Sequence, residues 1–120
     1  MKISIIIPNF NGKKLLEKNL PFIIKHSEGA EIIVVDDGST DETLDIANSL
    51  ASKNQNLSVV SLHPNRGYGA ALKAGFEHSK YKYIVFTDGD LQFDFSEVSK
   101  FIEKIDDADI VIGYRKVRRD

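Results

Sequence analysis

The sequence has 120 residues, of which 42% are hydrophobic and 28% charged, and its formal net charge is −2. This length allows one ordinary globular domain, 1–120, with a core that needs no covalent staples. The absence of cysteine excludes disulfides and thiolate metal sites, and the small net charge gives no sign of nucleic-acid binding.

Short apolar segments rich in β-branched residues recur along the whole chain. The segments that predict strands are 3–7, 31–35, 57–62, 83–87 and 110–112. Several of them are continuously apolar, which is typical of strands that are buried on both faces of a parallel sheet. We therefore predict an α/β fold with a doubly wound, mainly parallel sheet.

Helical patterns separate these segments. The first helix is expected from Lys13 to about Ser27, with an interruption at Pro21. The second begins after Ser39–Glu42, which supplies capping side chains and early acidic charge. The remaining two helices are marked by apolar residues at helical spacing: Leu72 and Phe76, then Val98, Phe101, Ile102 and Ile105.

Polar residues gather where the predicted strands end. The stretches are Pro8–Asn11, Asp36–Ser39, His63–Arg66, Asp88–Asp90 and Gly113–Arg115. In doubly wound sheets, ligands bind outside the carboxyl ends of the strands. The sequence therefore predicts a binding site at this edge of the sheet.

Asp88, Asp90 and Gln92 are spaced at i, i+2 and i+4. In an extended segment these side chains share one face, so three oxygen donors can converge on a hard cation such as Mg²⁺ or Mn²⁺. Gly89 allows a sharp turn or the close approach of a ligand. Taken alone, the pattern favours a polar turn after a strand, with the metal site as the alternative.

Asp36 and Asp37 end the second predicted strand. Two adjacent carboxylates beside a buried sheet are costly unless they are hydrogen-bonded or paired with a charge. One interpretation has a carboxylate accepting hydrogen bonds from the base or ribose of a nucleotide. The other has both solvated at the rim of the sheet, and the local pattern favours neither.

Two further segments are candidates for phosphate contacts. Residues 65–71 begin like the dinucleotide-binding motif G-x-G-x-x-G, but the position of its third glycine is Leu72. The small residues of this segment therefore favour close packing of a helix on the sheet. Arg66 in that segment remains a candidate phosphate contact. Arg115 follows the last predicted strand, and a guanidinium group suits phosphate because it donates two hydrogen bonds at once. The three histidines show no metal-ligand spacing.

A family resemblance is carried by four stretches, whose order and spacing along the chain are more specific than any one stretch alone. They are 5–11, 34–41, 65–71 and 87–90. Together they resemble the N-terminal half of family 2 glycosyltransferases, which have the Rossmann-like GT-A fold. The segments 88–94 and 113–116 resemble one branch, the dolichol- and polyprenyl-phosphate mannose and glucose synthases. The resemblance implies an inverting, metal-dependent transfer of a hexose from GDP-mannose or a UDP-sugar to a polyprenyl or dolichyl phosphate.

The resemblance also implies roles for individual residues. The nucleotide contacts that it implies are Pro8, Phe10, Val35, Asp37, Asp88 and Gly89. The implied ligands of Mg²⁺ or Mn²⁺ are Asp88, Asp90 and Gln92. The implied catalytic residues are Asp90 and Arg115, of which Arg115 contacts phosphate.

Family catalytic domains are longer than 120 residues, so the resemblance implies an acceptor-binding half beyond Asp120, and we expect this chain alone to be inactive. The expected partners are a nucleotide sugar and a lipid phosphate, without nucleic acid. The expected location is the cytoplasm, with membrane association through the missing C-terminal part.

Two alternatives are a nucleotidyltransferase and a non-catalytic nucleotide-binding module. A nucleotidyltransferase is expected to carry a glycine-rich basic loop after its first strand, and residues 8–12 do not supply one. A receiver-like signalling domain is disfavoured because its acidic residues would end strands one and three. In this chain they end strands two and four.

Overall fold

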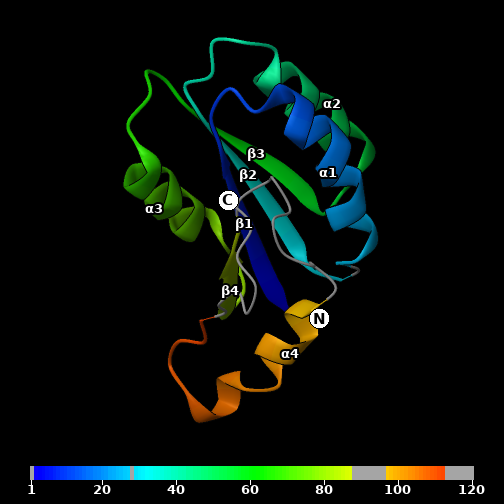
Figure 1. Cartoon of the computed structure of the whole chain (residues 1–120), viewed down its shortest axis with the longest axis vertical. Helices are drawn as coiled ribbons and strands as arrows, with labels where there is room; N and C mark the ends of the chain where they lie inside the picture. Colours follow the sequence, from blue (N-terminus) through cyan, green and yellow to red (C-terminus); the bar gives the residue numbers. More distant parts are fainter. Residues whose placement is uncertain (1, 28, 88–96, 113–120) are drawn as a thin grey trace, which may run out of the picture. The chain divides into compact units, whose positions relative to one another are not determined.

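The structure is a computed structural model that describes residues 2–27, 29–87 and 97–112 (Figure 1). The chain divides into two compact units, residues 1–90 and residues 91–120, which we describe separately. Within the described residues, no helix combines the length and the apolar character that crossing a membrane requires.

The first unit contains a parallel sheet with helices on both faces. Its strands are β1 (Ile3–Asn9), β2 (Glu31–Asp37), β3 (Leu57–Leu62) and β4 (Tyr83–Phe86). They lie in the order β3-β2-β1-β4, and every neighbouring pair is parallel. Helices α1 (Lys13–Lys25) and α2 (Thr43–Lys53) cover one face, and α3 (Tyr68–His78) covers the other (Figure 1). The predicted doubly wound α/β sheet is confirmed.

The two central strands, β1 and β2, carry the core. Their apolar segments Ile5–Ile7 and Ile33–Val35 have no exposed surface. Successive side chains of a strand point to opposite faces, so unbroken burial means that both faces of the sheet are covered. The two strands end level with each other, because Asn9 pairs with Asp36, and Asp36 pairs in turn with Ser61 of β3. Three loops therefore begin from one edge of the sheet.

Boundaries in the first unit differ in part from the sequence prediction. The strands β1 and β2 each run two residues further than expected, to Asn9 and Asp37. The expected interruption of the first helix at Pro21 is wrong, because α1 continues through it to Lys25. A proline inside a helix removes one hydrogen bond. Burial of Leu20 and Ile23 on either side of Pro21 offsets that loss.

The second unit corrects two predictions. The single helix expected through Ile105 is instead α4 (Val98–Ile102) followed by the 3₁₀ helix η2 (Ile105–Asp107). Its hydrogen bonds tighten from Glu103 N to Ser99 O, an i−4 bond, to i−3 bonds from Lys104 onward. The predicted strand 110–112 is also wrong: within the described part of the chain these residues pair with no strand, and Ile110 and Ile112 are 75% and 82% exposed. The backbone hydrogen bonds of a strand are made to a neighbouring strand, so an apolar segment without such a neighbour does not become one.

Two glycines of α3 have opposite surroundings. At Gly75 an added Cβ would lie 2.4 Å from Cγ2 of Ile6, so this glycine lets the helix approach β1 closely. At Gly69 an added Cβ would meet nothing within 4 Å, and the residue is helical. The structure therefore has room for a side chain at Gly69, and glycine there only adds conformational freedom to the unfolded chain.

We expect Gly69→Ala to raise the free energy of unfolding by about 0.5–1 kcal/mol, because alanine restricts the unfolded chain and favours the helix. Urea unfolding followed by circular dichroism measures it. Gly75→Ala is the control and should lower the same quantity, because the new methyl overlaps Ile6. A destabilised Gly69→Ala variant would contradict the open surroundings described at this position.

Candidate functional site

The loop from β1 to α1 is shaped by two asparagines. Asn9 accepts a hydrogen bond from the backbone N of Gly12 through Oδ1, over 3.0 Å. Asn11 adopts a positive φ of 51°, a conformation that asparagine tolerates better than most residues. Phe10, between them, has a side chain that is 53% exposed. The loop thus holds its own backbone and presents one aromatic ring outward.

Asn11 also fastens this loop to the next one. Its Oδ1 accepts a hydrogen bond from Thr40 N at 2.8 Å, and its backbone N donates to Ser39 Oγ at 2.9 Å. The carboxylate of Asp41 then accepts from both the backbone N and the hydroxyl of Thr43, the first residue of α2. The hydrogen bond from the Thr43 side chain lowers the pKa of Asp41. Asp41 thus bonds to the first residue of α2, but the predicted cap is only partly met, because Glu42, which directly precedes the helix, makes no side-chain capping hydrogen bond.

Asp37 joins the second loop to the third. Its side chain is nearly buried, and its Oδ1 and Oδ2 accept hydrogen bonds from the backbone N of Arg66 at 2.7 Å and of Gly67 at 2.9 Å. The side-chain nitrogen of Asn65 donates in return to the backbone O of Asp37 at 2.8 Å. Charge-assisted bonds of this kind are stronger than neutral ones. Asp37 therefore holds the start of α3 in place.

Asp36 has different surroundings from its neighbour. It points to the opposite face of the sheet, because adjacent strand residues alternate, and it is only 2% exposed. Its Oδ1 has no hydrogen-bond partner among the described residues. The expectation that buried carboxylates are hydrogen-bonded thus holds for Asp37 and fails for this oxygen of Asp36.

A cavity of about 230 Å³ opens at the carboxyl edge of the sheet. Its lining comes from β1, β2 and the region where α3 begins: Pro8, Asn9, Phe10, Asp37, Asn65, Gly67, Tyr68 and Ala71. Three residues that the sequence analysis assigned to a nucleotide, Pro8, Phe10 and Asp37, therefore meet in one place. Sequence reasoning missed Asn65 and Tyr68, whose segment was interpreted as helix packing.

Val35 does not belong to the cavity lining. It lies in the core with Ile6, Ile33 and Ala71, without exposed surface. Val35 and Asp37 share a face of β2, but the first lies under α3 and the second at its start. A direct contact between Val35 and a ligand is not what this geometry provides.

Five assigned residues lie outside the described part of the chain: Asp88, Gly89, Asp90, Gln92 and Arg115. The described chain reaches Thr87, whose backbone N donates to Ile6 O at 3.0 Å and so continues the pairing of β4 with β1. Within residues 2–27, 29–87 and 97–112, no three acidic or histidine side chains are grouped closely enough to hold a metal ion.

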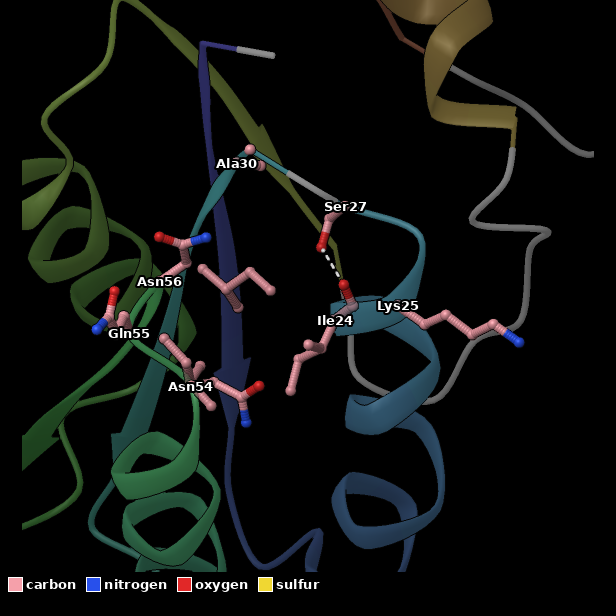
Figure 2. A pocket seen from close by; sticks show the side chains of 10 residues that line it. Ile24, Lys25, Ser27, Ala30, Asn54, Gln55 and Asn56 are labelled. Atoms are coloured by element: carbon pink, nitrogen blue, oxygen red, sulfur yellow. Dashed lines mark hydrogen bonds between the residues drawn. The ribbon is translucent and has the colours of Figure 1, made fainter.

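A second cavity, of about 260 Å³, lies at the opposite end of the sheet (Figure 2). The ends of α1 and α2 border it, and its named polar groups include Ser27, Asn54 and Lys25. Ser27 Oγ donates to Ile24 O at 3.4 Å, and Asn54 Nδ2 donates to Leu50 O at 2.8 Å, so these groups serve the helix ends. None of the predicted site residues lines this cavity, whereas three of them line the carboxyl-edge cavity, which is therefore the candidate site.

Comparison with known proteins identifies the family of the chain. The model of the family named Glycosyl transferase family 2 matches residues 4–120. The chain belongs to glycosyl transferase family 2. It is 32% identical, over all of its length, to the dodecaprenyl-phosphate galacturonate synthase of Rhizobium johnstonii. It is also 33% identical, over 98% of its length, to the undecaprenyl-phosphate 4-deoxy-4-formamido-L-arabinose transferase of Pseudomonas paraeruginosa. The chain spans 38% and 37% of the length of these two relatives.

Two similar solved structures contain nucleotide sugars. A mannosyltransferase from Pyrobaculum calidifontis, PcManGT, was solved with GDP-Man and Mn²⁺. It aligns with 74% of this chain and 27% of its own, at a TM-score of 0.67 and 28% identity. TarS 1–349 of S. aureus, in complex with UDP-GlcNAc, aligns with 89% of this chain and 31% of its own, at a TM-score of 0.72 and 31% identity. The GT-A-type fold of family 2 is therefore confirmed for this chain.

Proposed function

We propose that the chain binds the nucleoside diphosphate of a nucleotide sugar in the carboxyl-edge cavity. Within a longer family 2 enzyme, that site would serve the inverting transfer of a hexose to a polyprenyl phosphate. The observation that carries the proposal is the meeting of Pro8, Phe10 and Asp37 where ligands of doubly wound sheets bind. It is supported by neighbours solved with GDP-Man and UDP-GlcNAc, and by relatives named for polyprenyl-phosphate sugars.

Asp37 and Phe10 would form the nucleoside end of this site. Each oxygen of a carboxylate has two acceptor positions, so Asp37 can hold Arg66 and Gly67 and still accept a hydrogen bond from a base or ribose. Phe10 offers an exposed ring from the neighbouring loop. The two residues thus combine one polar contact with one apolar contact, the usual make-up of a small-molecule site.

The diphosphate end would use residues beyond Thr87. Asp88, Asp90 and Gln92 supply carboxylate and amide oxygens, the donor set that Mg²⁺ or Mn²⁺ prefers. When bound, such an ion neutralises charge on the departing nucleoside diphosphate. Gly89 allows the phosphates to approach the backbone, and Arg115 supplies a positive charge to them. A lipid-phosphate acceptor is already an anion, so Asp90 and Arg115 would act by positioning and charge.

We expect UDP and GDP to bind the chain in Mn²⁺ and to lose affinity roughly tenfold or more, about 1.4 kcal/mol, when the ion is chelated. Isothermal calorimetry with each nucleotide, before and after EDTA, measures the difference. Asp90→Asn should reproduce the effect of the chelator, and Glu77→Gln, an exposed acidic position of α3, should not. Equal affinities with and without EDTA would exclude the proposed metal role.

A further inference from the structure

Two large aromatic rings line the carboxyl-edge cavity, and both are more than half exposed. Phe10, in the loop after β1, is 53% exposed, and Tyr68, the first residue of α3, is 54% exposed. Single exposed apolar side chains are ordinary on protein surfaces, but large ones gathered at a concave site are typical of a binding surface. Tyr68 was not among the residues that the sequence assigned to a ligand.

The backbone beneath Tyr68 is fixed from both sides. Before it, Asp37 binds the backbone N of Arg66 and of Gly67, and Gly67 turns the chain with a φ of 98°. After it, Ala71 N donates to Gly67 O at 3.0 Å, which closes the first turn of α3. The ring of Tyr68 is therefore carried by an ordered helix start, so little backbone entropy would be lost when a ligand binds against it.

Phe10 stands on a similarly fixed backbone. The residue before it, Asn9, is paired with Asp36 at the end of the sheet. The residue after it, Asn11, is bonded to Thr40. The cavity is thus bordered by two aromatic residues whose backbones are fixed by long-range hydrogen bonds. The backbone positions of both residues are therefore preorganised for a ligand.

The polar groups around these rings already have structural partners. Both carboxylate oxygens of Asp37 accept backbone hydrogen bonds, Asn9 Oδ1 accepts from Gly12, and Asn65 Nδ2 donates to Asp37 O. A ligand with a flat π-system would gain most of its contact from the ring faces. Stacking on aromatic side chains is tolerant of base identity, because every nucleobase has a π-face.

We infer that Tyr68 is a nucleobase-binding residue that, together with Phe10, holds the base of the donor nucleotide by stacking, with uracil and guanine held to a similar degree. This inference rests on the proposed function, because it places the base of the nucleoside diphosphate in the same cavity. It adds a residue and a mode of recognition: the two rings supply the larger part of the base contact, beside the hydrogen bond that Asp37 can still accept.

The test is calorimetric titration of the 120-residue chain with UDP, GDP and inorganic pyrophosphate, all in Mn²⁺. Tyr68→Ala should weaken UDP and GDP by about 5- to 150-fold, the range expected for one lost stacking contact. Tyr68→Phe keeps the ring and should bind both within about twofold of the wild type. Pyrophosphate has no base, so its affinity should be the same in all three proteins.

Phe22→Ala is the matched control, because Phe22 is a partly exposed aromatic residue of α1 outside the cavity. It should leave all three affinities unchanged. Pyrophosphate affinity in Tyr68→Ala is the check on folding, because pyrophosphate would occupy the diphosphate end of the same site without a base to stack. A loss of pyrophosphate affinity would assign Tyr68 a structural role and overturn the inference.

The remaining outcomes separate the inference from the proposed function. If the wild type binds UDP and GDP and Tyr68→Ala binds them equally well, the inference is overturned while the proposed function stands. A loss confined to one base, or a loss that extends to pyrophosphate, also overturns it. If the wild type binds neither nucleotide in Mn²⁺, the proposed function fails and the inference fails with it.

Discussion

Replacing Asp37 by alanine is expected to lower the free energy of unfolding by about 3 kcal/mol and to abolish measurable nucleotide binding. The variant loses two hydrogen bonds from the backbone of Arg66 and Gly67 to a charged acceptor, and such bonds contribute about 1.5–3 kcal/mol each. Both hydrogen bonds are partly exposed, so we expect each to contribute near its lower limit, which gives a sum of about 3 kcal/mol. Urea unfolding and calorimetric titration of UDP and GDP measure the two effects.

Asp37→Asn and Asp36→Asn complete this experiment. The first keeps one oxygen and should retain about half of the stability that Asp37 contributes, because its amide nitrogen cannot accept from a backbone N–H. The second should unfold within about 1 kcal/mol of the wild type, since Oδ1 of Asp36 has no hydrogen bond to lose. Equal losses for the two aspartates, or an unchanged Asp37→Ala, would show that Asp37 does not hold the loop.

These variants separate what the sequence could and could not predict about the acidic pair. The position of both aspartates at the end of a buried strand followed from the apolar segment before them. Their different roles did not, because the partners of Asp37 are 29 and 30 residues away in the chain. No local pattern specifies a hydrogen bond to a backbone N–H of a distant loop.

Dependence on distant parts of the chain also explains where the predicted elements and ligand contacts differ from the structure. The strands β1 and β2 were predictable because burial on both faces leaves a continuous apolar pattern, and the half-exposed β3 and β4 because of their β-branched and aromatic residues. The segment 110–112 has the composition of a strand, yet a strand exists only beside a partner, and composition says nothing of that partner. Val35 was assigned to a ligand through family resemblance, whereas its 0% exposure comes from α3 packing over β2.

Tyr68 shows a different limit. Residues 65–71 were interpreted as small residues that allow helix packing, and Ala71 and Gly75 do pack closely on the sheet. A tyrosine among them carries no signal of its own, because exposed tyrosines are common. Only the three-dimensional arrangement places Tyr68 and Phe10 in the lining of one cavity.

Gly38→Ala is expected to be the most damaging single methyl in this part of the chain, with a loss of roughly 2–5 kcal/mol in the free energy of unfolding. Two costs add at this position. Gly38 has a φ of 70°, where an L-residue is strained by about 1–2 kcal/mol. An added Cβ would also lie 2.4 Å from the backbone N of Asn65 and 2.8 Å from its Cα, an overlap that typically costs about 1–3 kcal/mol.

Gly67→Ala is the control that separates these two costs. Gly67 also has a positive φ, 98°, but a Cβ there would meet nothing within 4 Å, so only the backbone strain remains. With a ψ of 166°, Gly67 lies in a region that only glycine normally adopts, so its backbone strain is at least that of Gly38. The difference between the two variants in urea unfolding is therefore a lower limit for the cost of the contact between the loop after β2 and the loop after β3. Because backbone atoms of Asn65 cannot rotate away as a side chain can, we expect that difference to be about 1–3 kcal/mol. Equal losses in the two variants would mean that the contact between these loops is looser than described, and the cavity that they border would then not be preformed.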